Sequence, residues 1–126
     1  MPDATEHEGV RLALARYFQG HATGEAIHMR KAFLETAHIE GIREGGFVSW
    51  TLEEYCALFT GAPAADEATR QRRIDSIDVS GTAAIAKATL AHGAVTFTDY
   101  FVLLEVDGVW KIANKVYHGQ RAESER

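Results

Sequence analysis

The sequence has a single cysteine and no long apolar run, and each of these two absences excludes a class of protein. Cys56 alone can form no disulfide within the chain, and it cannot supply a cysteine-rich metal site. No apolar stretch approaches the ~20 residues that cross a membrane, and the N-terminus lacks the basic and apolar regions of a signal peptide. We therefore expect a cytoplasmic protein that does not interact with membranes.

Basic residues are outnumbered, since 13 Lys and Arg against 18 Asp and Glu give a formal net charge of -5. The densest basic cluster, Arg70-Gln71-Arg72-Arg73, is followed at once by Asp75 and Asp78. A nucleic-acid surface needs clustered Lys and Arg, so we expect no nucleic-acid partner. The six histidines are scattered singly, without the spacing of metal ligands. We expect neither a metal nor a cofactor.

What is present is typical of one globular domain. A chain of 126 residues with 46% hydrophobic and 25% charged residues can build one core but not two. We expect residues 1–126 to form a single domain that ends in a polar tail at about 120–126. The loop Gly61–Ala65 separates a helix-rich first half from a strand-rich second half, but it is too short for a domain linker.

Apolar residues at helical spacing predict helices over about Thr5 to Gly20, Glu25 to Phe33, and Thr51 to about Thr60. The third helix begins with a capping box, Thr51-Leu52-Glu53-Glu54. Between the second and third helices, weak alternation predicts a hairpin of about Ala37–Ile42 and Phe47–Trp50. The second half predicts strands in series at Gln71–Val79, Ala83–Ala91, Val95–Val106 and Val109–Gly119. Helices followed by an antiparallel meander predict an α+β fold, with the helices on one face of a curved sheet.

The last hairpin allows a prediction of which residues share a face. A tight type I′ turn at Asp107-Gly108 would pair Val106 with Val109. Walking back from this pair places Phe97, Asp99 and Phe101 on one face, opposite His118, Val116 and Asn114 respectively. A row of alanines in the preceding strand joins this face, where it either leaves room for a pocket or allows close helix contact. A β-bulge would shift this register.

The opposite face would carry Tyr100, Val102, Leu104, Ala113 and Tyr117. These side chains are too apolar to remain in water, and the helices cannot cover both faces of the sheet. An exposed apolar patch of this kind usually marks an interface. We therefore expect a homodimer formed through the outer face of the sheet.

Several segments occur in a recognisable order: ALARYFQG, AHIEGI, FVSW, TLEEYCALF and FTDYFVLLEVDGVWKIANKVYH. Over residues from about 8 to 119 the chain resembles the nuclear transport factor two-like superfamily. Within it, the chain is most similar to the group called putative lumazine-binding proteins, a group similar to SnoaL-like polyketide cyclases and ketosteroid isomerases. The resemblance implies a cone-shaped, cystatin-like α+β barrel, a pocket between sheet and helices, and dimerisation through the sheet. The name of the group does not imply flavin chemistry.

The resemblance also raises the question of catalysis. Ketosteroid isomerases hold an oxyanion with a Tyr and a protonated Asp, and use a carboxylate as base. The two donor positions fall at Tyr17 and Asp99. The base position falls at about Gly41, and the neighbouring Glu40 would point to the opposite face. His38 would replace the base if the first hairpin turns it inward; without a base at hydrogen-bond reach, no proton abstraction of that type occurs.

Asp99 itself has two interpretations. Burial among phenylalanines and alanines would favour the neutral carboxyl, which could donate a hydrogen bond to a ligand. Alternatively, Asp99 is a structural residue that is bonded to Tyr17 or to a backbone amide. If a pocket is open, the residues that we expect at the ligand are Tyr17, His38, Trp50, Tyr55, Phe97, Asp99, Phe101, Asn114 and His118.

Three functions remain open at this stage. The favoured one is a dimeric domain that binds a small apolar or aromatic ligand without catalysis. The second is an isomerase- or cyclase-like enzyme that uses Asp99 with Tyr17, and His38 or Glu40 as base. The third is a structural or interaction module whose pocket is filled by its own side chains. A cavity beside Asp99 distinguishes the third from the other two.

Overall fold

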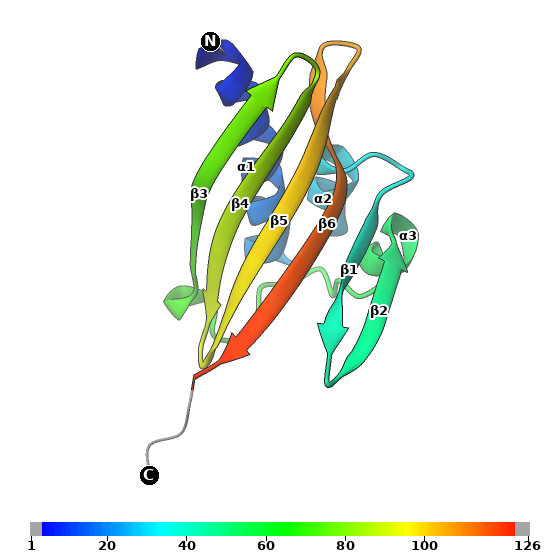
Figure 1. Cartoon of the computed structure of the whole chain (residues 1–126). Helices are drawn as coiled ribbons and strands as arrows, with labels where there is room; N and C mark the ends of the chain where they lie inside the picture. Colours follow the sequence, from blue (N-terminus) through cyan, green and yellow to red (C-terminus); the bar gives the residue numbers. More distant parts are fainter. Residues whose placement is uncertain (1–3, 123–126) are drawn as a thin grey trace.

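The computed structural model describes residues 4–122, without the side chains of residues 4–6. The chain begins with helices α1 (Ala4–Thr23) and α2 (Ala26–Ala32), the hairpin β1 (His38–Arg43) and β2 (Gly46–Thr51), and the short helix α3 (Leu52–Cys56) (Figure 1). A 3-10 turn, η1 (Glu67–Thr69), leads into a meander of β3 (Gln71–Ser80), β4 (Ala83–His92), β5 (Val95–Val106) and β6 (Val109–Arg121). The predicted strands are confirmed to within two residues at each end.

Local sequence accounts for the ends of several elements. Thr51 and Glu54 form the predicted capping box at the start of α3, although the helix ends at Cys56 and not near Thr60. Asp107 and Gly108 have φ angles of 52° and 80°, as a type I′ turn requires. The strand β6 is longer than predicted, because Arg121, which we expected in a polar tail, pairs with Val95. The rest of that tail, residues 123–126, lies outside the described residues.

The described strands form one curved sheet in the order β2-β1-β6-β5-β4-β3. Neighbouring strands are antiparallel except β1 and β6, which are parallel, so the sheet is mixed and not purely antiparallel as predicted. The parallel pairing covers only Ile39–Gly41 and Lys115–Tyr117. Beyond these residues the two strands diverge toward one end of the molecule (Figure 1).

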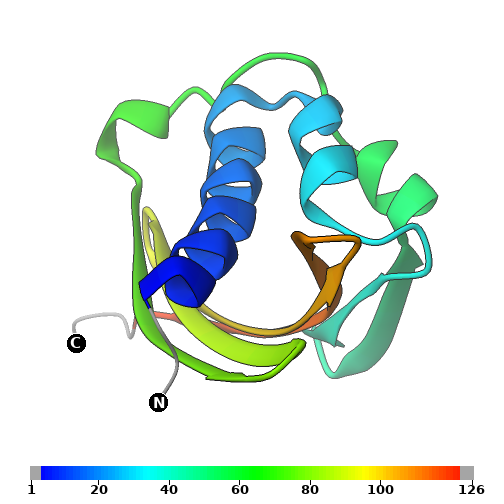
Figure 2. The same ribbon diagram turned by 90° about the horizontal axis from the view of Figure 1, so that it is seen from above.

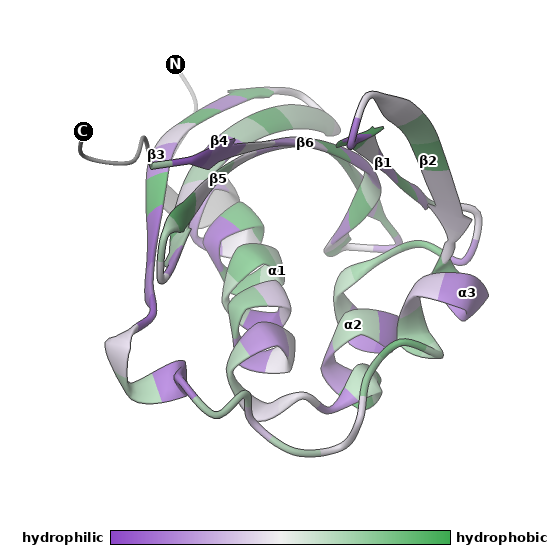
Figure 3. Cartoon of the chain, turned by 90° about the horizontal axis from the view of Figure 1, so that it is seen from below, coloured by the Kyte–Doolittle hydropathy of each residue, from purple (hydrophilic) through white to green (hydrophobic). Residues whose placement is uncertain are grey.

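The helices α1 and α2 lie in the concave side of the sheet (Figure 2). Buried apolar residues from the helices and from the sheet form one core between the two layers. Figure 3 colours the ribbon of both layers by residue hydropathy. The predicted alanine row of β4 faces this interface and is buried together with Leu90 at its end. From α1, Leu14 and Tyr17 are fully buried, and the Tyr17 ring packs edge-on against Phe101 at 5.0 Å between centroids. The α+β prediction is thus confirmed.

A β-bulge in β6 changes which side chains reach the concave face. The predicted register holds from Val106–Val109 to Leu103–Ile112, but Val102 then pairs with Asn114, leaving Ala113 as an extra residue. Beyond the bulge the alternation of side chains is reversed. The prediction that Asn114, Val116 and His118 share the face of Asp99 is therefore wrong, because the facing residues are Lys115 and Tyr117.

No helix within residues 4–122 is long and apolar enough to cross a lipid bilayer.

Candidate functional site

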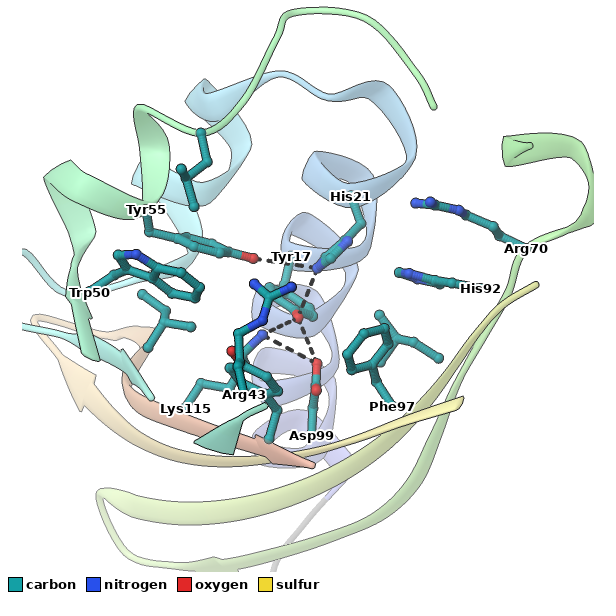
Figure 4. Close-up of a pocket in the computed structure, with 14 residues that line it drawn as sticks. Tyr17, His21, Arg43, Trp50, Tyr55, Arg70, His92, Phe97, Asp99 and Lys115 are labelled. Carbon is teal, nitrogen blue, oxygen red and sulfur yellow. Dashed lines mark hydrogen bonds and ion pairs between the residues drawn. The ribbon is translucent and has the colours of Figure 1, made fainter. Parts of the chain in front are cut away.

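A cavity of about 240 Å³ lies between the concave face of the sheet and the helices (Figure 4). Its walls combine aromatic and basic side chains. They are formed by Tyr17, His21, Ile39, Arg43, Trp50, Tyr55, Leu58, Arg70, Leu90, His92, Phe97, Asp99, Lys115 and Tyr117. The cavity lies beside Asp99, so the chain's own side chains do not fill this space.

Three residues from different elements meet at the floor of the cavity. The Tyr17 hydroxyl, from α1, donates a hydrogen bond to Asp99 Oδ2 on β5 at 2.6 Å. Lys115 Nζ, from β6, donates to the Tyr17 oxygen at 2.6 Å and lies 3.5 Å from Asp99 Oδ2. Asp99 and Lys115 are only 1% and 5% exposed, and Tyr17 is fully buried. Burial of charge is costly unless it is paired, so these three groups depend on one another.

The pairing determines the hydrogen-bonding role of Asp99. Asp99 Oδ2 accepts the hydrogen bond of the Tyr17 hydroxyl and lies 3.5 Å from the ammonium of Lys115. The expected bond between Asp99 and Tyr17 is therefore present, with the Tyr17 hydroxyl as the donor. Burial and the nearby Asp99 charge raise the pKa of Tyr17 well above its ordinary value, so its hydroxyl keeps its proton.

Lys115 is held by aromatic rings as well as by charge. Its Nζ lies 4.8 Å from the ring centroid of Tyr17, 5.6 Å from that of Tyr55 and 5.1 Å from that of Tyr117. Burial lowers the pKa of Lys115, while the neighbouring Asp99 acts in the opposite direction. The ring faces add cation–π attraction to the charged form. Lys115 thus serves as the cation at the centre of the floor.

His21 extends the network by one helical turn beyond Tyr17. Its Nε2 lies 2.9 Å from the Tyr17 oxygen and 3.4 Å from that of Tyr55. Burial, reinforced by Lys115, lowers the pKa of His21 well below its ordinary value, so the ring is neutral at pH 7. Since the Tyr17 proton is directed to Asp99, His21 carries its proton on Nε2 and donates to Tyr17.

This lowered pKa predicts a loss of stability in mild acid. The unfolded chain takes up a proton on His21 near pH 6.5, whereas the folded chain does so only at lower pH. Below about pH 6.5 the unfolded state therefore binds more protons, and the free energy of unfolding should fall by up to about 1.4 kcal/mol per pH unit. Urea denaturation between pH 7.5 and 5.5 measures this slope, above the range in which carboxylates titrate.

Two variants separate His21 from the other histidines. His21→Gln should reduce the slope and leave the smaller part that His92 contributes, because burial lowers the pKa of His92 as well. His38→Gln should keep the slope, because His38 is exposed. An unchanged slope in His21→Gln would contradict the assignment.

The position of the isomerase base is sterically closed in this chain. A Cβ atom on Gly41 would lie 2.7 Å from Cζ of Tyr117 and 2.8 Å from its Cε1, closer than real Cβ contacts. The neighbouring Glu40 accepts hydrogen bonds from Ser49 at 2.8 Å and Asn114 at 3.3 Å, outside the cavity lining. Neither position therefore offers a carboxylate to the cavity.

The structure brings together five of the nine residues expected at a ligand: Tyr17, Trp50, Tyr55, Phe97 and Asp99.

The other four lie elsewhere. His38 is exposed on the outer side of β1, so it cannot replace the base in this conformation. Asn114 lies beyond the bulge and accepts a hydrogen bond from the His38 backbone at 3.0 Å. His118 is exposed and lies near Gln120, and Phe101 is buried behind Tyr17.

Sequence reasoning did not identify His21, Arg43, His92, Lys115 or Tyr117 as cavity residues. Simple spacing would have found three of them. His21 follows Tyr17 by four residues on a helix, Arg43 follows Gly41 by two on a strand, and His92 follows Leu90 by two. Spacing gives no such signal for Lys115 and Tyr117, because the bulge at Ala113 changes the face of the sheet toward which their side chains point.

Among the described residues, no group of three or more His, Cys, Asp and Glu could hold a metal ion.

Comparisons with known proteins agree on one fold family. The family model described as "Putative lumazine-binding" matches residues 5–118. A search of curated proteins found no match. Among solved structures, an NTF2-like protein of unknown function from Shewanella baltica is 25% identical, with a TM-score of 0.86 over 97% of this chain and 99% of that chain.

Two further structures extend the comparison. An NTF2-like protein of unknown function from Methylobacillus flagellatus is 28% identical, with a TM-score of 0.84 over 94% of this chain and 95% of that chain. A domain of unknown function with a cystatin-like fold from Nostoc punctiforme is 13% identical, with a TM-score of 0.70 over 98% of this chain and 81% of that chain. The latter similarity shows the fold alone, and it agrees with the predicted cystatin-like architecture.

Proposed function

Because the chain belongs to the "Putative lumazine-binding" family, with an NTF2-like fold, we propose that it binds a small aromatic molecule between the sheet and the helices. The observation that carries the proposal is the pair of facing aromatic walls. Trp50 and Tyr55 line one side of the cavity, and Phe97 lies on the opposite side (Figure 4). A concave site with apolar walls and a few convergent polar groups is the usual form of a small-molecule site.

The volume limits the size of the ligand. A cavity of about 240 Å³ is smaller than the ~300–1,000 Å³ of typical drug-sized sites. A ligand with one or two fused rings fits this space, and offset or edge-on stacking on aromatic side chains would stabilise it. The floor of Tyr17, Asp99 and Lys115 orients the ligand in this proposal, and no proton transfer is assigned to it.

Filling the cavity tests the proposal. p-Cresol, a neutral one-ring probe, should bind the natural protein with a dissociation constant of about 1 mM, or about -4 kcal/mol. Leu90→Trp adds a large side chain at the cavity wall and should weaken binding at least tenfold. Leu12→Trp adds the same side chain at an exposed position on α1, outside the cavity lining, and should leave binding unchanged.

Circular dichroism first establishes that the three proteins are equally folded. Isothermal titration calorimetry then compares their dissociation constants for p-cresol. Equal binding by both tryptophan variants would exclude this cavity as the site, and no binding by the natural protein would contradict the proposal.

We also propose that the outer face of the sheet packs against a second copy of the chain. Ile85, Tyr100, Val102, Leu104 and Val116 lie on this face and are 41–49% exposed. Tyr117, which we expected in this patch, lines the cavity and does not lie on the outer face. Ala113, also expected there, is the extra residue of the bulge. A two-fold dimer would bury the patch against itself.

A further inference from the structure

We infer that the ligand is an acidic aromatic molecule, with a hydrogen-bond donor at its inner end and a carboxylate at its outer end. This inference rests on the proposed function and adds the chemical class of the ligand. It follows from the polar groups of the cavity that the described residues leave unsatisfied. Asp99 marks the inner end, and Arg43 marks the outer end.

The inner end is defined by the second oxygen of Asp99. Tyr17 and Lys115 both approach Oδ2, whereas Oδ1 is buried and has no hydrogen-bond partner among the described residues. A carboxylate only accepts hydrogen bonds, so this oxygen needs a donor. Asp99 is 1% exposed and lines the cavity, so a group inside the cavity is placed to supply this donor. A phenol O–H or a ring N–H at the inner end of the ligand would supply the missing donor.

One wall of the cavity carries two more polar atoms that are buried and available for hydrogen bonds to a ligand. His92 Nε2 and Tyr117 Oη are buried without a well-formed hydrogen bond in the part of the chain that the structure describes. Burial raises the pKa of Tyr117, and the Arg43 side chain lies close enough to act on that pKa in the opposite direction. Both rings pack against Phe97, at centroid distances of 6.1 Å for Tyr117 and 5.3 Å for His92. This wall therefore offers hydrogen bonds at the edge of an aromatic surface, which suits a ring with polar substituents better than a plain hydrocarbon.

The outer end is defined by the cation that lacks an acidic partner. Within residues 4–122, Lys115 is paired with Asp99, and Arg70 is paired with Asp66 at 2.9 Å. Arg43 takes part in none of the salt bridges between described residues, and its guanidinium carbon lies 5.8 Å from the ring centroid of Trp50. Figure 4 shows Arg43 extending toward the space in front of Lys115 and Asp99.

An arginine without an acidic partner is suited to bind a carboxylate. The planar N–H groups of its guanidinium match the two carboxylate oxygens. A neighbouring hollow shares Arg43, Phe97 and Tyr117 with the cavity and adds Arg121 and Glu44. The entrance therefore keeps an excess of positive charge although the whole chain has a net charge of -5. Such a local field favours entry of an anion.

Three related probes separate the two ends of the ligand. 4-Hydroxyphenylacetate has both the donor and the carboxylate, 4-methoxyphenylacetate lacks the donor, and 4-hydroxyphenylacetamide lacks the charge. Isothermal titration calorimetry at pH 7.5 should show that 4-hydroxyphenylacetate binds at least tenfold more tightly than either of the other two probes. Arg43→Gln should remove the preference for the acid over the amide. The control Arg11→Gln, at an exposed position on α1, should retain it.

Each outcome has a distinct meaning. Equal binding of the acid and the amide by the natural protein would overturn the role of Arg43, and equal binding of the hydroxy and methoxy acids would overturn the role of Asp99. In both cases the proposed binding of aromatic molecules would stand. Failure of all three probes to bind, together with failure of p-cresol, would contradict the proposed function itself.

Discussion

Lys115→Met should lower the free energy of unfolding by about 3–5 kcal/mol, the usual cost of breaking a buried ion pair. The substitution keeps an unbranched side chain of similar length but removes the ammonium. Asp99 would then remain buried at 1% exposure with a charge that only the Tyr17 hydroxyl contacts. The Tyr17 oxygen would also lose the hydrogen bond from Nζ at 2.6 Å. Urea denaturation at pH 7.5 measures the difference.

A matched control distinguishes burial of the ion pair from loss of a lysine as such. Lys87 lies on the outer face, where its Nζ is 5.8 Å from the Tyr100 ring centroid and the residue is exposed. Lys87→Met should change stability by no more than about 0.5 kcal/mol. The double variant Asp99→Leu with Lys115→Met removes both charges and should recover at least half of the loss. Equal effects of the two single lysine variants would contradict the account of the floor.

Val102→Asp should convert the proposed dimer into a monomer. Val102 is 48% exposed at the centre of the outer patch, paired with Ile85 on one side and Asn114 on the other. In a two-fold interface the substitution would bury two like charges close together, without partners, which costs several kcal/mol. Light scattering after gel filtration at about 100 µM should give twice the chain mass for the natural protein and the chain mass for the variant.

Leu12 provides the control for this experiment. It is 51% exposed on α1, in the helical layer on the other side of the molecule. Leu12→Asp should remain dimeric. A chain mass for the natural protein would refute the proposed dimer, and a dimeric Val102→Asp would exclude this face.

Much of the fold could be predicted because local signals and the tertiary structure agree. The Asp107-Gly108 turn, the alternation of β4 and β5, and the cap at Thr51 each identify an element within a few residues. The parallel pairing of β1 with β6 was missed. It joins segments about 75 residues apart, and no local pattern indicates which strand edges meet.

The candidate site was predicted only in part, and a single β-bulge accounts for the main error. Strict alternation from Val109 places Asn114 inside and Lys115 outside. The extra residue at Ala113 reverses both, so a lysine and not an asparagine lies beside Asp99. Burying a lysine is unfavourable on its own, and only the combination with Asp99 and Tyr17 makes it stable. Such a combination of residues from three elements cannot be read from the spacing within one strand.

The structure explains why the position of the isomerase base, at Gly41, carries no carboxylate. Gly41 was expected to leave the base position empty, but the Tyr117 ring also occupies the space that a side chain there would need. The Tyr17 hydroxyl already donates a hydrogen bond to Asp99, and Lys115 donates one to the oxygen of Tyr17. The polar groups therefore form a closed floor under an aromatic cavity, and Asp99 Oδ1 is left for a ligand.

Binding in this cavity can be observed most directly through the two tryptophans. Trp50 lines the cavity, whereas Trp110 is buried in the core at the start of β6, against Gly9 of α1. Each indole N–H gives one cross-peak in a proton–nitrogen NMR spectrum of the labelled protein. Titration with 4-hydroxyphenylacetate should shift the Trp50 cross-peak in a saturable manner and leave that of Trp110 in place. A saturable shift of Trp110 alone, or no shift of either cross-peak, would contradict the account.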